Sequence, residues 1–440
     1  MKSHFATFKD IMKMALPLIA GHLGHTLTGA VDVLVAARYS VNALAAVSVA
    51  NAILFSIFIC GIGIAGAVSI LISNGRGAGK PVRKYLISSV LISQILATVF
   101  ALICLSVIPF IDRFGFDPVL ISDIKEYMFI VSFSLFGMYL YQALKEFLQA
   151  YEIVTFPNAL VGLCVVLNYF LNTALVNGIC GIPPLGVKGL AIATLIVRSF
   201  MGIALLLYCR FTFFQKHKMM FSPQYFKKVL LVGVPIGFGL LAEFLGFNLI
   251  TAAVARQSGL LAATHNILIT LSSATFTVPL GIAGVISVKT AFFSGARNFE
   301  KVVEYSKVGV SSCVLFMSLC GVMFFAFPKF FINLFTSDLL ILQTAVPVVA
   351  VLALFQVADG LQISLGGVLK GLKMTKEVTT CVITCYWLFG VPAGFFCAYV
   401  LNMSLKGFWT GIALALFLVA ITECILISRK FKRLSVEFKS

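Results

Sequence analysis

The sequence predicts an all-α membrane protein with twelve transmembrane helices in two similar six-helix halves. Composition, the spacing of apolar runs and an internal repeat lead to this prediction. Hydrophobic residues make up 60% of the 440 residues and charged residues 11%, against about 25% charged in a typical soluble domain. A soluble chain of this length could not bury so much apolar surface, whereas lipid can solvate it.

The apolar runs are long enough to cross a bilayer as helices, for which about 20 residues suffice. Polar breaks separate these runs and define where each helix begins and ends. The predicted spans are 12–38, 43–72, 84–110, 124–149, 157–177, 187–213, 229–255, 260–286, 302–328, 340–370, 376–400 and 406–428. The fifth is the shortest and carries two asparagines.

The placement of Lys and Arg gives the orientation. With the N-terminus inside, 25 of the 33 basic residues fall in inner segments, 7 fall in outer ones, and Arg198 lies mid-helix without an assigned role. This asymmetry predicts a multi-pass inner-membrane protein with both termini in the cytoplasm. Basic clusters between apolar runs suit an anionic membrane face. The net charge of +17 therefore points to the lipid bilayer as a partner and not to nucleic acid.

An internal repeat appears when the chain is shifted by about 218 residues. The matching pieces are Pro17 with Pro235, 37–40 with 255–258, and 188–190 with 406–408. Six helices per half give both halves the same membrane orientation, which makes the repeat parallel. We expect an amino-terminal lobe over 1–214 and a carboxy-terminal lobe over 215–440, linked by the basic stretch 210–228. Two-lobed carriers with a central cavity commonly use this arrangement.

Asp32 is the first acidic residue at membrane depth, where a charge is costly and therefore suggests a function. His25 lies two turns earlier on the same helix face, and Thr28 lies one turn earlier. A carboxylate beside an imidazole and a hydroxyl can bind a cation or carry a proton. The alternative is a buried structural aspartate satisfied by neighbouring helices.

Asn168 and Asn172 lie one turn apart on the fifth span, and Thr194 lies on the sixth. Their oxygens are neutral ligands that suit a hard cation such as Na⁺ once a carboxylate supplies charge. Alone, the asparagine pair is more typical of hydrogen bonding between helices. Its meaning depends on whether it faces Asp32.

Glu243 and Asp359 form a second candidate site in the second half, with Gln356 as a contributor. Carboxylates in an apolar cavity would attract lipophilic cations, and they could take up protons because burial disfavours the charged form. The other acidic residues are expected in loops or at helix ends. Pro17 and Pro235 each remove a backbone hydrogen bond and could let their helices bend.

Enzyme motifs are missing from the sequence. No zinc-protease, nucleophile-elbow or Walker pattern occurs, so we expect no catalytic residues, no enzymatic activity and no organic cofactor. Gly61 to Gly66 fit the dinucleotide fingerprint, but they lie inside an apolar run with no preceding strand, where close helix packing is the better interpretation.

Several segments together resemble the multidrug and toxic compound extrusion (MATE) family, within the multidrug/oligosaccharidyl-lipid/polysaccharide exporter superfamily. The segments that carry the resemblance are 16–19, 29–33, 43–47, 186–194, 233–236 with Glu243, and Gln356 with Asp359 and 367–371. Individually they are loose motifs. Together they span essentially the whole chain, with the same number of helices and the same repeat.

The resemblance implies an antiporter that expels small organic cations against inward Na⁺ or H⁺ flow, and we expect it to act as a monomer. Asp32, Asn168, Asn172 and Thr194 match the family's amino-lobe cation site. The matches to the carboxy-lobe acids of the branch typified by NorM are Glu243 and Asp359. Some members carry Asp where this chain has Asn172, which leaves one carboxylate fewer here. Ion or proton binding at Asp32 would shift the equilibrium between outward- and inward-facing states.

Two other functions stay open. A flippase for a lipid-linked sugar belongs to the same superfamily, although the deep charges here are mainly acidic. A cation channel would use Asp32 for selectivity, but a two-half repeat with single acids off the axis argues against a pore. The residues do not decide between Na⁺ and H⁺ and do not name the substrate.

Overall fold

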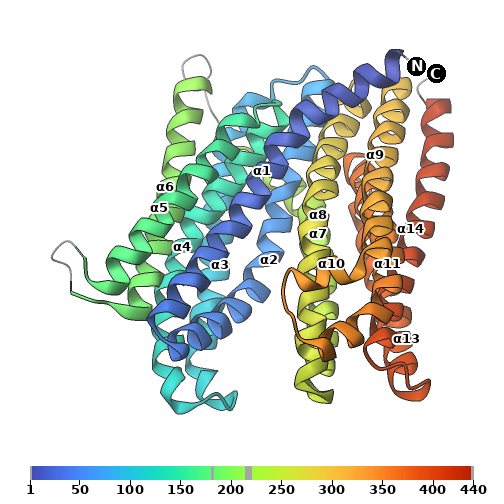
Figure 1. Cartoon of the computed structure of the whole chain (residues 1–440). Coiled ribbons are helices and arrows are strands. Elements are labelled where there is room, and N and C mark those ends of the chain that lie inside the picture. Colours follow the sequence, from blue (N-terminus) through green and yellow to red (C-terminus); the bar gives the residue numbers. More distant parts are fainter. Residues whose placement is uncertain (1, 180–182, 214–220, 438–440) are drawn as a thin grey trace. The chain divides into compact units, whose positions relative to one another are not determined.

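The computed structural model describes residues 2–179, 183–213 and 221–437, and in these residues every regular element is a helix (Figure 1). The elements of the first half are α1 (Lys2–Tyr39), α2 (Val41–Gly77), a 3₁₀ turn (Val82–Tyr85), α3 (Leu86–Val107), a second 3₁₀ turn (Ile108–Arg113), α4 (Pro118–Ala150), α5 (Thr155–Asn177) and α6 (Gly186–Phe213). Hydrocarbon offers no partner for backbone polar groups, so an apolar chain of this kind must satisfy them within helices.

The second half follows the same plan. Its elements are α7 (Pro223–Gln257), α8 (Gly259–Gly295), α9 (Phe299–Ala326), α10 (Pro328–Asn333), α11 (Leu339–Gly371), α12 (Thr375–Thr384), a π turn (Cys385–Gly390), α13 (Val391–Phe395), a second π turn (Phe396–Val400) and α14 (Ser404–Glu437).

In the described residues, 11 helical stretches are long and apolar enough to cross a membrane. They correspond to eleven of the predicted spans, and α12 to the second π turn count as one stretch. The remaining predicted span is α4, whose 33 residues correspond to about 50 Å of helix. Its charged residues lie toward its two ends. The predicted all-α membrane fold with twelve long helices is confirmed.

The helices cluster into two compact units. The amino unit comprises Ala20–Gly75 and Lys80–Gly237, and the carboxy unit comprises Met1–Ile19, Arg76–Gly79 and Phe238–Ser440. Each unit has its own apolar core. The predicted lobe boundary at 214/215 lies in 214–220, outside the described residues, and the two-lobe division at that point stays a prediction.

The unit boundaries within α1 and α7 fall just after a proline. Pro17 lies two residues before the boundary at Ile19, and Pro235 lies two residues before the boundary at Gly237. These two positions are also counterparts in the sequence repeat. In each of these two helices, the part before the boundary therefore packs with one unit and the rest of the helix packs with the other.

In the amino unit, α6 packs closely against α4 and also packs against α5. Gly137 of α4 permits this approach, because a Cβ there would lie 2.5 Å from the Arg198 carbonyl oxygen. Small residues bring helix backbones together in this way when lipid gives no hydrophobic drive for association. This contact fixes the position of Arg198 along α4, and with it the position of Thr194, which lies one turn earlier on α6.

In the carboxy unit, α11 is the central helix and packs against α8, α9 and α14. Glycines on its surface mark two of these contacts. A Cβ at Gly360 would lie 2.8 Å from Met317 of α9, and one at Gly367 would lie 2.8 Å from the Ala283 carbonyl oxygen of α8. The polar side chains of α11 are consequently held inside the unit.

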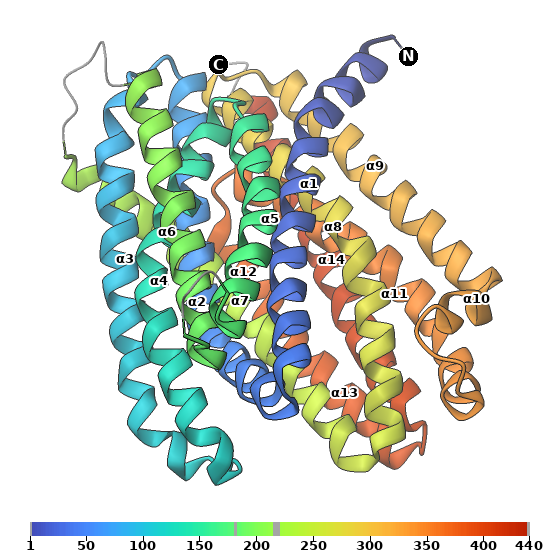
Figure 2. The same cartoon turned by 60° about the vertical axis from the view of Figure 1, so that its left-hand side comes forward.

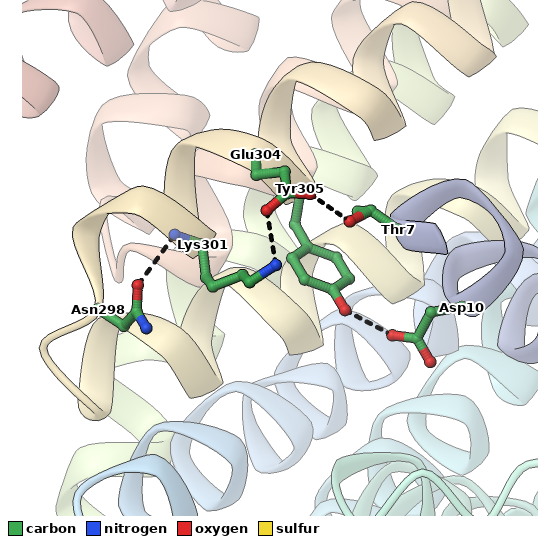
Figure 3. Close-up of polar contacts among 6 residues, drawn as sticks. All are labelled: Thr7, Asp10, Asn298, Lys301, Glu304 and Tyr305. Atoms are coloured by element: carbon green, nitrogen blue, oxygen red, sulfur yellow. Dashed lines mark hydrogen bonds and ion pairs between the residues drawn. The ribbon is translucent and has the colours of Figure 1, made fainter. Parts of the chain in front are cut away.

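The first residues of α1 are tied to α8 and α9 by polar contacts, some of which are drawn in Figure 3. Asp10 Oδ2 lies 2.7 Å from Lys289 Nζ and accepts a 2.7 Å hydrogen bond from the Tyr305 hydroxyl. Thr7 Oγ1 donates to Glu304 Oε1 over 2.6 Å. These contacts explain why Met1–Ile19 packs with the carboxy unit although it precedes the first half's other helices.

The first and last described helices of the chain agree with an even number of membrane crossings. The first turns of α1 and the last turns of α14 belong to the carboxy unit and lie at the same end of it in both views (Figures 1 and 2). An even number of membrane crossings requires this arrangement.

Candidate functional site

The amino unit brings three of the predicted polar residues together. Asn172 Nδ2 donates a 2.6 Å hydrogen bond to Asp32 Oδ1, and the same nitrogen lies 3.1 Å from Asn168 Oδ1. Asp32 comes from α1 and the asparagines come from α5. Asp32 is 6% exposed, Asn168 is 1% exposed and Asn172 is fully buried. The asparagine pair therefore faces Asp32, which was the condition for interpreting it as part of a site.

Unused hydrogen-bonding atoms surround this carboxylate. In the described residues, Asn172 Oδ1, Asn168 Nδ2 and Thr194 Oγ1 are buried and make no hydrogen bond of regular geometry, although Asn168 and Thr194 lie close enough to act on the Asp32 carboxylate. Buried polar groups normally find partners, because an unsatisfied one costs about 1–3 kcal/mol. One carboxylate, one amide oxygen and one hydroxyl offer oxygen ligands for a hard cation, or hydrogen-bonding positions for water that carries a proton.

Two further residues act on this cluster: Tyr127, which the sequence did not single out, and Arg198, to which the sequence gave no role. The Tyr127 hydroxyl is an electrostatic neighbour of Asp32 and donates to Asn51 Oδ1 over 3.2 Å. Arg198 lies one turn after Thr194 on α6, and its charge also acts on Asp32. Tyrosine is common in membrane helices, so no sequence signal marked Tyr127.

The Arg198 guanidinium has defined contacts inside the amino unit. Its Nη1 donates to Ser134 Oγ over 2.9 Å, and its Cζ lies 5.7 Å from the centre of the Phe58 ring. Arginine over an aromatic face gains a cation–π contact. This guanidinium therefore stays near the Asp32 cluster as a fixed positive charge.

His25 and Thr28 contact other groups. The Thr28 hydroxyl donates to the Gly24 carbonyl within α1 over 3.0 Å. The His25 ring meets the Tyr141 ring edge-on, with centroids 5.8 Å apart. The structure therefore associates His25 with α4, while Asp32 faces α5.

The carboxy unit contains the second predicted pair. Glu243 of α7 and Asp359 of α11 are electrostatic neighbours, and Asp359 is 5% exposed. The Tyr386 hydroxyl lies 3.3 Å from Glu243 Oε1. Gln356 lies one turn before Asp359 and donates from Nε2 to Thr275 Oγ1 over 2.6 Å. Glu243, Asp359 and Tyr386 thus form one polar cluster, in which Asp359 and Tyr386 are buried and Glu243 is half-buried.

Tyr386 lies in the π turn Cys385–Gly390, which interrupts the predicted helix 376–400. Trp387, in the same turn, donates from Nε1 to the Ala242 carbonyl over 3.2 Å. Single π turns within α-helices are rare and are frequent at functional sites. The continuous apolar run gave no sign of this turn, and it brings two aromatic side chains to α7 beside Glu243.

The repeat relates the two units at these positions. His25 and Tyr141 precede Glu243 and Asp359 by 218 residues each. The first pair is in ring contact, and the second pair consists of electrostatic neighbours. At the positions in the amino unit that are equivalent to the acid pair of the carboxy unit, the chain has an imidazole and a phenol.

One acidic residue lies where the sequence interpretation did not place it. Glu423 was expected near a helix end, with the predicted span closing at 428. Instead α14 continues to Glu437, and the Glu423 side chain is fully buried. The expectation that all the remaining acids lie in loops or at helix ends is wrong for this residue.

Comparisons with known proteins agree with one another. The MatE family model matches residues 17–174 and 235–396. The chain is 28% identical over 440 residues to the probable multidrug resistance protein NorM of Pseudomonas putida, covering 97% of this chain and 95% of the relative. It is 27% identical over 436 residues to the multidrug resistance protein NorM of Vibrio vulnificus, covering 92% of each.

Solved structures show the same fold. The Vibrio cholerae MATE transporter VcmN in its bent form matches with a TM-score of 0.88 at 17% identity, over 99% of both chains. A MOP superfamily transporter from Pyrococcus furiosus matches with a TM-score of 0.88 at 17% identity, over 98% of this chain and 97% of that one. The family model covers well over half of the residues, and its two matched segments fall in the two repeats. This chain belongs to the MatE family and is a multi-pass membrane transporter.

Proposed function

We propose that this protein is a secondary active multidrug efflux transporter that exports lipophilic organic cations in exchange for Na⁺ or H⁺. It acts as a monomer in the inner membrane with both termini in the cytoplasm. The observation that carries the proposal is the buried Asp32–Asn172–Asn168 cluster with its unused polar atoms. The names of the NorM relatives support the substrate class.

The amino-unit cluster is the proposed site of the coupling ion. Asp32 supplies the charge, and the Asn172 and Thr194 oxygens supply neutral ligands. A bound Na⁺ or proton neutralises the carboxylate and relieves the cost of a buried charge. Because neutralisation stabilises one conformation more than another, ion binding shifts the population between outward- and inward-facing states.

The carboxy-unit acids are the proposed attraction for the cationic substrate. Glu243 is half-buried and Asp359 is buried. Water therefore screens little of the electrostatic attraction between these carboxylates and a cation that reaches them. Ion and substrate need not touch. Coupling requires only that each prefers a different conformation, and the coupling energy is the difference in affinity.

The test is cation transport by the purified protein in liposomes with the membrane potential clamped. A fluorescent lipophilic cation such as ethidium is supplied with either a Na⁺ gradient at uniform pH or a pH gradient without Na⁺. We expect one gradient to drive the cation uphill at saturable rates, and protein-free liposomes serve as the control.

Other results separate the rivals. Failure of both gradients, combined with movement of a lipid-linked sugar across the same liposomes, would replace the proposal with flippase activity. Ion conductance that does not saturate would replace it with a channel.

A further inference from the structure

A polar face runs along α11 inside the carboxy unit. Gln356, Asp359, Gln362, Gly366 and Lys370 follow one another at intervals of three or four residues, which places them on one side of the helix. The first four are buried and Lys370 is half-buried. Asp359 and Lys370 are about 16 Å apart along the helix axis. The proposed substrate acids occupy only the first part of this face.

Glu423 of α14 meets the same face further along. A Cβ at Gly366 would lie 3.3 Å from Glu423 Oε1 and 3.8 Å from Oε2. The Glu423 carboxyl therefore packs against the α11 backbone at Gly366, where a residue with a side chain would crowd it. Glu423 is fully buried, and neither oxygen has a hydrogen-bond partner in the described residues. An ionised carboxylate in such a place is costly unless a positive charge compensates it.

Lys370 supplies that charge, and two acids share it. It lies one turn after Gly366, and both Glu423 and Glu243 act on it electrostatically. Glu243 comes from α7 and Glu423 from α14, so one ammonium group serves acids on two different helices. Whichever carboxyl is ionised gains the interaction with Lys370, and the other is then favoured in its neutral form.

Two other described neighbours of Glu423 carry no compensating charge. From α12 and the π turn after it, the thiols of Cys381 and Cys385 are electrostatic neighbours of Glu423. Neutral thiols cannot replace Lys370. A metal cation is disfavoured here because the nearby ammonium would repel it. The ligand that suits a lone buried carboxyl beside a lysine is a proton.

We propose that Glu423 is a further proton-binding carboxyl of the carboxy unit and that it exchanges its proton with Glu243 under the control of Lys370. In one state Glu423 is a neutral acid and Lys370 balances the Glu243 carboxylate. When the proton moves to Glu243, the O–H bond at Glu423 breaks, an O–H bond forms at Glu243, and Lys370 balances Glu423. The net charge of the three groups is unchanged, so the exchange avoids an uncompensated buried charge.

This exchange would make Glu243 sensitive to the proton supply and would thereby affect substrate release. That consequence rests on the proposed antiport, whereas protonation of Glu423 does not. The two are therefore measured separately.

The direct test is infrared difference spectroscopy of the reconstituted protein across a pH titration. Protonated carboxyl groups give a C=O band that carboxylates lack. We expect a buried carboxyl band that titrates in the wild type, is lost in Glu423→Gln and is unchanged in Glu377→Gln, a matched control at an exposed acid. If the Glu423→Gln protein keeps every titrating carboxyl band of the wild type, the proposal is overturned.

A second variant tests the role of Lys370 even if Glu423→Gln folds poorly. In Lys370→Met the ionised form of Glu423 loses its compensating charge, so the protonated band should persist to higher pH. A band that titrates as in the wild type would overturn the sharing of Lys370.

Transport gives an independent readout. In Glu423→Gln we expect proton-driven efflux to fall at least tenfold, while exchange of labelled substrate at equilibrium is retained. If the wild type itself shows no efflux, the proposed function fails. The infrared spectra still decide whether Glu423 binds a proton. Wild-type efflux without a Glu423 band would leave the proposed function standing and remove this inference.

Discussion

Asn172 Nδ2 lies 2.6 Å from Asp32 Oδ1 and joins α5 to α1 inside the amino unit. The amide donates a hydrogen bond to the carboxylate but cannot neutralise it. Its own oxygen stays buried without a partner in the described residues. This pair therefore combines a charge that needs a counterion with an oxygen that can help to bind one.

Replacing Asn172 with Asp tests this arrangement. Two carboxylates at this distance cannot both stay ionised without a cation or proton between them, so Asn172→Asp should bind the coupling ion more tightly. We expect roughly a tenfold gain, or about 1.4 kcal/mol, measured by ion titration of the purified protein. Asn177→Asp, at an exposed position on the same helix, is the matched control. Equal affinity in Asn172→Asp and the wild type would remove Asn172 from the site.

The Tyr386 hydroxyl supports Glu243 across 3.3 Å. Tyr386→Phe removes one hydrogen bond, worth about 1 kcal/mol, from the ionised acid. Binding of a lipophilic cation should weaken about fivefold, as measured by equilibrium binding in detergent. Tyr399→Phe, at an exposed tyrosine in the second π turn, should bind as the wild type does. A Tyr386→Phe protein with unchanged affinity would show that the phenol does not act on the substrate site.

Asp10 connects the start of α1 to two helices of the carboxy unit. It pairs with Lys289 of α8 and accepts a hydrogen bond from Tyr305 of α9, which Figure 3 shows. Asp10→Asn leaves the buried Lys289 ammonium without this carboxylate and should destabilise the protein by about 2 kcal/mol. Thermal unfolding in detergent measures the loss. Combining Asp10→Asn with Lys289→Met should restore part of the stability, because the two effects are coupled. Strictly additive losses would contradict a direct interaction.

Pro17 precedes the point at which α1 passes from the carboxy unit to the amino unit. Pro17→Ala restores a backbone donor in mid-helix and should stiffen α1. Transport should slow several-fold while substrate binding is retained. Pro328→Ala, at the first position of α10 where proline fits a helix without strain, should transport normally. Wild-type transport rates in Pro17→Ala would show that bending at this residue is not limiting.

Much of the candidate site could be predicted from the sequence because charges and amides stand out in an apolar chain. Asp32, Glu243 and Asp359 were identified by the cost of a charge at membrane depth, and Asn168 and Asn172 by their one-turn spacing. The structure brings these residues into two clusters, one in each unit. Their roles in ion and substrate binding remain proposals.

What the sequence did not predict depends on helix packing. Glu423 looked like a helix-end residue because the apolar run closes soon after it, and only the contact of α14 with Gly366 shows it to be buried. Tyr127 and Tyr386 carry no charge, so nothing distinguished them from other aromatic residues. The π turn around Tyr386 leaves the apolar pattern continuous and is invisible to periodicity.

The most direct test of the account compares the wild type with Asp32→Asn in liposomes, with two readouts on the same sample. One readout is uphill accumulation of a lipophilic cation driven by the effective ion gradient, and the other is exchange of labelled cation at equilibrium. If Asp32 holds the coupling ion, Asp32→Asn abolishes accumulation and retains exchange, because the variant loses the ion site but keeps the substrate site. Accumulation in Asp32→Asn equal to that of the wild type would contradict the account and move the coupling site to the carboxy-unit acids.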